Sequence, residues 1–160
     1  MAQLIGIGVG PGDPDLLTVK AVKAIQNADV IMCPASAEDR PSIALSVISS
    51  LIDKSKNQEI VKLIFPMTKD KDVLEAHWKT NAKIMAEKVL SGKNAVYLTV
   101  GDPYLYSTWI YMHRDISANY PDIKISVIPG IVSMFTFASK VELVLQKVLK
   151  KLQLFHPAMT

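Results

Sequence analysis

The segment GIGVGPGDPD at positions 6–15 concentrates the residue types that could shape a ligand site. Its four glycines would let the backbone turn tightly and approach a bound molecule closely. The spacing is not a dinucleotide-binding GxGxxG fingerprint, because Pro11 or Asp13 stands where the third glycine is required, and no Gly-Lys-Ser/Thr follows as in a P-loop. A tight strand-to-helix turn without a ligand is an equal alternative for this segment on its own.

Two later segments also combine turn residues with exposed backbone groups. They are VGDPYLYSTW at 100–109 and VIPGIVS at 127–133. Asp102 could cap a following helix or accept a hydrogen bond from a ligand hydroxyl. Taken singly, each segment is better explained as an ordinary helix cap or turn.

The remaining candidates for chemistry are isolated side chains. His77, His113 and His156 lack metal-ligand spacing, so we expect no metal site. Cys33 has no obvious partner and is expected to pack at a strand end. Arg40, one of only two arginines, follows a predicted strand and is the better candidate for binding a carboxylate.

Five short apolar runs, each followed by Gly or Pro, must position these residues. The predicted strands are 3–9, 28–33, 59–65, 94–100 and 123–128, and the predicted helices between them are 14–26, 42–52, 70–91 and 105–118. Asp13 is the N-cap candidate of the first helix, Pro14 takes its first position, and Gly92 closes the helix at 70–91. This alternation predicts an α/β fold with a mostly parallel five-stranded sheet flanked by helices. Ligands of such folds bind beyond the carboxyl ends of the strands, where all three motif segments fall.

The composition is that of an ordinary globular domain. The chain has 160 residues, 49% apolar, with a net charge of +3 and one cysteine. The single cysteine argues against a disulfide framework and fits a reducing, cytoplasmic location. Neither a membrane span nor a secretory signal is apparent. The mild charge is compatible with an acidic small molecule but does not favour a nucleic-acid partner.

Taken together and in order, the three motif segments resemble the tetrapyrrole methylase family, the class III S-adenosylmethionine-dependent methyltransferases. The resemblance begins with GVGPGDPDLLTVKA and ADVI at 28–31, continues through the Gly-Asp-Pro loop and the Pro-Gly-Ile turn, and covers residue 3 to about 140. FPM at 65–67, Trp78 and YSTWIY at 106–111 are most similar to members that methylate carbon 20 of precorrin-2 or of its cobalt-containing counterpart.

The resemblance implies methyl transfer from S-adenosylmethionine to carbon 20 of a dihydro-tetrapyrrole in cobalamin synthesis, with no metal required. It places the cofactor contacts, mostly through backbone groups, at Pro11, Val100, Gly101, Asp102, Leu105, Val132 and Ser133, with Ser107 and Thr108 close by. The polycarboxylate macrocycle would lie over the same edge, with Arg40 contacting a carboxylate.

One departure bears on the acceptor. Members acting on uroporphyrinogen-type substrates carry a Tyr-Asp pair where this chain has Cys33 and Pro34. Such an acceptor is therefore disfavoured, and the catalytic base stays unassigned. A diphthamide or ribosomal-RNA acceptor is a further alternative within the family. A non-catalytic fragment that associates through apolar surface is the alternative outside it.

The tail differs from the rest of the chain. Residues 143–160 lack Gly, Asp and Glu, and residues 141–155 have the apolar spacing of a basic amphipathic helix, which could suit a membrane surface. We favour a frameshift instead, since a one-base upstream shift of the back-translated codons for 146–160 permits AEGSEKIAIIPPCYD, which reads like the start of a next strand.

Family members have a second domain that completes the cofactor cleft and helps form a homodimer. We therefore expect an N-terminal family domain at 1–140, an atypical basic tail at 141–160 and no second domain. On this expectation, the chain alone would have weak or no activity.

Overall fold

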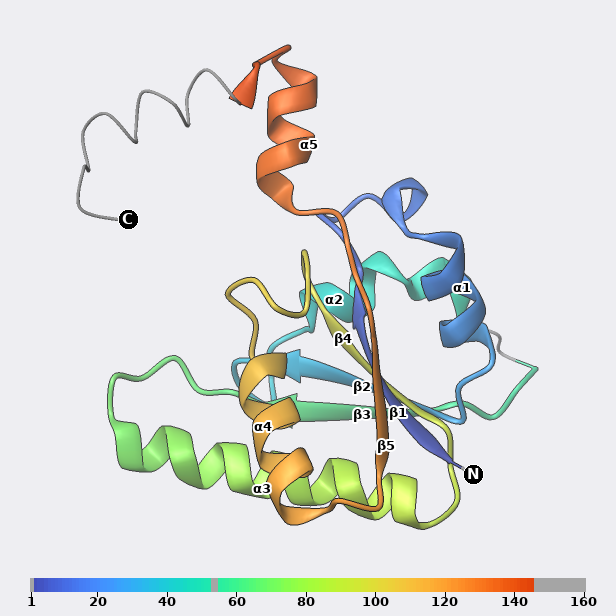
Figure 1. Cartoon of the computed structure of the whole chain (residues 1–160), viewed down its shortest axis with the longest axis vertical. Coiled ribbons are helices and arrows are strands. Elements are labelled where there is room, and N and C mark those ends of the chain that lie inside the picture. The colour runs from blue at the N-terminus through green and yellow to red at the C-terminus, as the bar shows by residue number, and fades with distance from the viewer. Residues whose placement is uncertain (1, 53–54, 146–160) are drawn as a thin grey trace.

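A computed structural model describes residues 2–52 and 55–145 of the chain (Figure 1). The five predicted strands all form, and they make one sheet in the order β3-β2-β4-β1-β5 with every neighbouring pair parallel. Their bounds are β1 Gln3–Gly8, β2 Val30–Ala35, β3 Glu59–Ile64, β4 Ala95–Thr99 and β5 Lys124–Ile128. The expected α/β architecture with a parallel sheet is confirmed.

The burial of the strands follows their order in the sheet. Every residue of the central strand β4 is buried, whereas the edge strands β3 and β5 contain exposed positions. A parallel sheet covered on both faces requires apolar side chains on both sides of its central strands. That requirement explains why AVYLT and VIMC read as continuous apolar runs rather than alternating ones.

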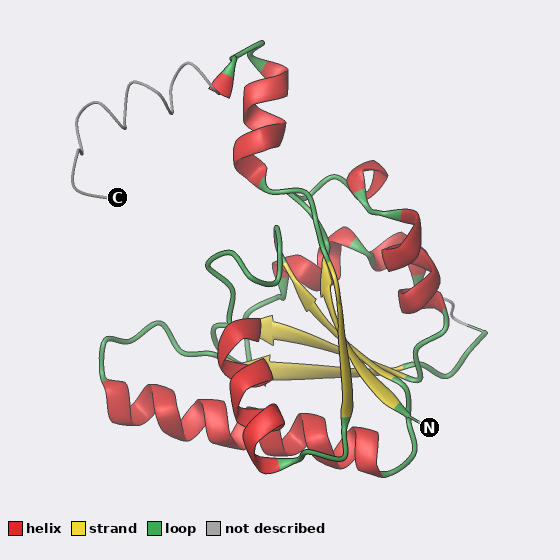
Figure 2. Ribbon diagram, viewed as in Figure 1, coloured by secondary structure: helices red, strands yellow, loops and turns green. Residues whose placement is uncertain are grey.

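Helices cover the two faces of the sheet in separate pairs (Figure 2). α1 (Val19–Gln26) and α2 (Ile43–Val47) pack on one face in a core with Ile7, Ile31 and Leu98. α3 (Lys71–Leu90) and α4 (Trp109–Asn119) pack on the other in a core with Leu4 and Tyr97. Each face of the sheet therefore has its own apolar core.

The first predicted helix, at 14–26, is wrong as a single element. A 3-10 turn, η1 (Pro14–Leu16), comes first, and α1 begins only at Val19 because Leu17 and Thr18 have extended backbones. Asp13 caps the 3-10 turn, while the Thr18 hydroxyl accepts from the Ala21 N–H and caps α1. The helix expected at 42–52 is likewise divided into α2 and a 3-10 turn, η2 (Ser49–Leu51).

The helix expected at 105–118 begins later, at Trp109. Tyr106 has a left-handed backbone, with φ of 52°, which a continuing right-handed helix cannot contain. Residues 102–108 form a loop as a result. α3, in contrast, matches its predicted span, with Asp70 as its N-cap and Gly92 at φ of 88° just beyond its end.

A further helix, α5 (Ser133–Lys140), was not predicted, and it projects away from the sheet (Figure 1). The helix considered for 141–155 does not start at residue 141, because residues 141 and 142 form a turn with Glu142 at φ of 52°. Residues 146–160, which include the segment of the frameshift hypothesis, lie outside the described residues. No helix in the described part of the chain is long and apolar enough to cross a membrane.

Candidate functional site

The three motif segments meet at the carboxyl ends of β1, β4 and β5, which lie side by side in the sheet. β1 and β4 are hydrogen-bonded neighbours, but the helices that follow them, α1 and α4, pack on opposite faces. The backbone therefore diverges above and below the sheet at this point. Such a switch in direction is the usual ligand-binding place of an open parallel sheet.

Three glycines bring the segments into direct backbone contact. A Cβ on Gly8 would lie 2.4 Å from the Gly101 carbonyl oxygen and 2.5 Å from the Gly130 nitrogen. A Cβ on Gly130 would lie 2.1 Å from the same Gly101 oxygen. Only glycine fits at positions 8 and 130, so the close approach of the three loops explains these residues directly.

Asp102 ties two of the segments together with its carboxylate. One oxygen accepts from the Tyr104 N–H at 2.9 Å, and the other accepts from the Gly130 N–H at 3.2 Å. Gly10 and Gly101 also exchange backbone hydrogen bonds across the gap between their strands, at 2.9 and 3.4 Å. Asp102 thus braces the loops and does not cap α4, which was one of its two expected roles.

Two pairs of hydroxyls hold the end of the Gly-Asp-Pro loop on β4. The Thr99 and Ser107 hydroxyl oxygens lie 2.8 Å apart, and the Tyr97 and Thr108 hydroxyl oxygens lie 2.6 Å apart. The Ser107 oxygen also accepts from the Trp109 N–H at 3.1 Å and so begins α4. Complete burial raises the pKa of Tyr97 far above its ordinary value, so the phenol stays protonated at neutral pH.

The predicted cofactor residues divide into two groups in the structure. Gly101, Asp102 and Val132 are half-buried, whereas Val100, Leu105 and Ser133 are exposed on the same edge, and Pro11 lies half-buried in the first turn. Ser107 is buried and Thr108 half-buried, and their hydroxyls are engaged within the fold, as described above. The first group thus lies at the surface of this edge of the sheet, whereas the Ser107 and Thr108 hydroxyls are bonded within the fold.

Arg40 lies exposed in the loop after β2, and Lys62 holds that loop. The Lys62 ammonium donates to the backbone carbonyls of Glu38 at 2.7 Å and Arg40 at 3.5 Å. The sequence reasoning missed Lys62, because a lysine in an alternating edge strand is usually a solvated side chain. Its role depends on the fold of a loop 22 to 24 residues away.

The sheet edge where the three motif segments meet has charges that suit a ligand with a positive charge and apolar groups. Segments 8–12, 100–105 and 130–133 contain no Lys or Arg, and Asp102 places a carboxylate between them. Val100 and Leu105 add exposed apolar surface beside Gly101, where a Cβ would meet no atom within 4 Å. A sulfonium such as that of S-adenosylmethionine fits these groups, whereas a phosphate would lack basic partners.

Cys33 is fully buried, as predicted, but it lies within β2, two residues before the strand ends at Ala35, rather than at the strand end. Burial raises the pKa of its thiol, and its sulfur lies 3.8 Å from the Val61 carbonyl oxygen. A protonated thiol followed by Pro34 offers no acid–base pair at this position. Within the described residues, no three His, Cys, Asp or Glu side chains are grouped so that they could hold a metal ion.

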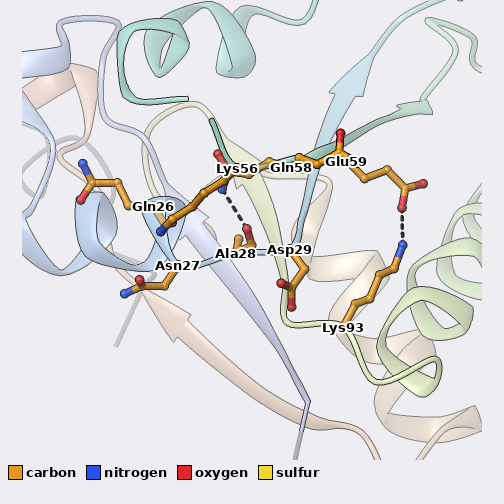
Figure 3. Close-up of a pocket in the computed structure, with 9 residues that line it drawn as sticks. Gln26, Asn27, Ala28, Asp29, Lys56, Gln58, Glu59 and Lys93 are labelled. Carbon is orange, nitrogen blue, oxygen red and sulfur yellow. Dashed lines mark hydrogen bonds and ion pairs between the residues drawn. The ribbon is translucent and has the colours of Figure 1, made fainter. Parts of the chain in front are cut away.

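A hollow of about 700 Å³ lies at the opposite edge, by the amino ends of β2 and β3 (Figure 3). Side chains that line it donate hydrogen bonds to backbone carbonyls at the carboxyl end of α1. The Lys56 ammonium donates to the Gln26 carbonyl at 3.0 Å, and the Gln58 amide donates to the Ile25 and Ala28 carbonyls at 2.9 and 2.8 Å. This hollow is a helix-capping junction remote from the motif loops, so it is not the candidate site.

Comparison with known proteins identifies the family that the chain resembles. Residues 3–160 match the family described as Tetrapyrrole (Corrin/Porphyrin) Methylases. A probable cobalt-precorrin-2 C(20)-methyltransferase of Methanocaldococcus jannaschii is 37% identical over 86% of this chain and 56% of its own length. The cobalt-precorrin-2 C(20)-methyltransferase of Salmonella typhimurium is 31% identical over 88% of this chain and 57% of its own.

A solved structure shares the fold. The cobalt precorrin-4 methyltransferase structure superposes with a TM-score of 0.62 at 27% identity, covering 88% of this chain and 50% of that one. The chain thus spans about half the length of the relatives it matches.

Proposed function

Because this chain belongs to the tetrapyrrole methylase family, we propose that it carries the N-terminal domain of an S-adenosylmethionine-dependent methyltransferase that acts on carbon 20 of precorrin-2 or cobalt-precorrin-2. The observation that carries the proposal is the meeting of the three motif loops at the switch point between β1 and β4. The named activities of the two relatives supply the acceptor and the carbon.

The bound cofactor would supply a methyl group already activated by its sulfonium. The backbone groups around Gly101 and the apolar side chains of Val100 and Leu105 would bind and orient it, with Pro11, Val132 and Ser133 closing the sides. The Asp102 carboxylate, held by two N–H donors, would favour the positive charge. Orientation alone can lower a barrier by about 7–11 kcal/mol in ideal cases.

The acceptor would lie over the same edge. Arg40, on the loop held by Lys62, is proposed to contact one of its carboxylates. Cys33 and Pro34 offer no base for the removal of the proton. We further propose that the enzyme is cytoplasmic. We also propose that its full-length form is a homodimer, which the molecular mass of a full-length relative in solution would test.

The first test is calorimetric titration of the purified chain with S-adenosylhomocysteine, the unreactive product form. One-to-one saturable binding is expected, weakened by the Asp102→Ala substitution and unchanged by Gly92→Ala, which lies at the opposite edge. No binding at millimolar cofactor would contradict the proposal.

The second test is incubation of the purified chain with precorrin-2 and S-adenosylmethionine that carries a ¹³C-labelled methyl group. Carbon magnetic resonance of any product identifies the methylated carbon. Label at carbon 20 supports the assignment. Label at another carbon would favour the alternative of a different corrin methylation, as in the cobalt precorrin-4 enzyme whose fold this chain shares.

A further inference from the structure

We propose that Tyr97 and Thr99 are positioning residues that set the conformation of the Gly-Asp-Pro loop at residues 102–108, which would contact the cofactor. They do so through the hydroxyl ladder, defined as the pairs Tyr97–Thr108 and Thr99–Ser107. The proposal deepens the function above and rests on it for the identity of the ligand. The placement of the loop itself does not depend on any ligand.

The ladder follows from the geometry of β4. Tyr97 and Thr99 are two residues apart on a strand, so their side chains leave the same face of the sheet. That face is covered by α3 and α4 and carries an apolar core. Tyr97 is completely buried and Thr99 is 5% exposed, so both hydroxyls need partners inside the protein.

The partners are consecutive residues at the end of the Gly-Asp-Pro loop. Ser107 is 6% exposed and serves both Thr99 and the Trp109 N–H, so one hydroxyl joins β4 to the first turn of α4. Thr108 stands at the N-cap position of α4 but makes no capping hydrogen bond with its side chain. Its hydroxyl is paired with Tyr97 instead.

The ladder has a counterpart at the start of the loop. Asp102 is bound to the Gly130 and Tyr104 N–H groups, and Gly101 is bound to Gly10. The backbone is thus fixed on both sides of the three residues that protrude, Tyr104, Leu105 and Tyr106. Tyr106 is fully exposed in a left-handed conformation, which the fixed flanks maintain at a cost in backbone energy.

A loop held in this way is ordered before the cofactor arrives. Binding then requires less ordering of the backbone, which improves affinity. Ser107 and Thr108 would therefore affect the cofactor through the shape of the loop rather than by contact. Tyr97 and Thr99, whose hydroxyls lie beneath the site, would affect it in the same way.

The test compares the unchanged chain with two variants of similar shape: Thr99→Val, which replaces the hydroxyl with a methyl group, and Tyr97→Phe, which removes the hydroxyl. Amide hydrogen exchange of residues 104–109 is expected to accelerate about five-fold relative to amides of β1, the effect of losing one net hydrogen bond. The affinity for S-adenosylhomocysteine should fall by a similar factor. Thr99→Ser, which retains a hydroxyl, should keep both the exchange rate and the affinity close to those of the unchanged chain.

Two controls separate positioning from stability. Thr80→Val makes the same chemical change on the exposed side of α3, where the hydroxyl bonds only the Ala76 carbonyl, and should alter neither readout. Val89→Ala removes buried side chain from the same core at the far end of α3. It should lower the melting temperature without selective exchange in the loop.

The proposal is overturned if Thr99→Val and Tyr97→Phe change loop exchange no more than core exchange. It is also overturned if Val89→Ala weakens cofactor binding as much as Thr99→Val or Tyr97→Phe does when the variants have lost the same stability. An unchanged chain that binds no S-adenosylhomocysteine would refute the proposed function instead. The exchange measurement would still decide the role of the ladder.

Discussion

At the residue scale, the chain needs glycine for two different physical reasons, and only the first concerns the site. Gly8 and Gly130 are needed because another loop occupies the space of a side chain. Gly92 is needed because its backbone is left-handed, at φ of 88°, while the space around it is open. The two kinds of glycine should respond differently to the same substitution.

We predict that Gly130→Ala lowers the free energy of unfolding by about 2–3 kcal/mol, since its Cβ would meet backbone atoms that cannot move aside alone. Gly92→Ala should cost only about 1–2 kcal/mol, the conformational penalty of a left-handed residue. Urea unfolding of both variants measures the difference. Equal losses would show that the loops can separate without cost.

Asp102 allows a second prediction at this scale. Asp102→Ala removes acceptors from the Tyr104 and Gly130 N–H groups and should cost about 1–2 kcal/mol of stability. It should also weaken S-adenosylhomocysteine binding, measured by calorimetry. Asp13→Ala is the matched control, because the Asp13 carboxylate caps only an exposed turn through the Asp15 N–H. Equal effects of the two substitutions would contradict the bracing role of Asp102.

At the element scale, Glu59 joins three parts of the fold. Its carboxylate pairs with Lys88 of α3 and, at 2.8 Å, with Lys93 in the connection to β4. Hydrogen bonds from Lys88 and then Lys93 hold the pKa of Glu59 below its ordinary value of 4.5. A carboxyl whose pKa is lowered by folding stabilises the folded state above its unfolded pKa and loses that effect as pH falls.

The Glu59→Gln substitution should therefore reduce the melting temperature slightly at pH 7. The deficit should shrink as pH falls from 4.5 through the lower folded-state pKa, because the native carboxyl is then protonated as well. Thermal unfolding of both chains across pH 2–7 tests this, and added salt should reduce the deficit at pH 7. A deficit that is constant with pH would exclude the ion pairs as its cause.

At the scale of the whole molecule, the described residues of α5 and of the segment after it expose apolar side chains. They include Met134, Phe135, Phe137, Val141 and Leu143. Phe135 is 53% and Phe137 62% exposed. An apolar patch of this kind favours association with other surfaces.

We predict that Phe135→Ser combined with Phe137→Ser lowers self-association of the purified chain and changes its unfolding free energy by less than about 1 kcal/mol. Sedimentation velocity at several concentrations measures the first effect, and urea unfolding the second. A large loss of stability would show that these phenylalanines pack against the domain. Unchanged association would place the contact elsewhere.

The sequence by itself determined the elements and the edge at which the motifs lie. Apolar runs of strand length, each ended by Gly or Pro, predict all five strands, because burial on both faces and local turn chemistry act within a few residues. The same local signals did not predict where the backbone changes conformation inside an expected helix. Thr18 divides the first helix, and the left-handed Tyr106 delays α4.

Only the tertiary structure decided which groups touch. Gly8 meets Gly130, Asp102 reaches across 28 residues to the Gly130 N–H, and Lys62 reaches back to the Arg40 loop. Each contact depends on the strand order β3-β2-β4-β1-β5, which places β1 between β4 and β5. That order is set by the packing of helices on two faces, a property of the whole chain that no local pattern encodes.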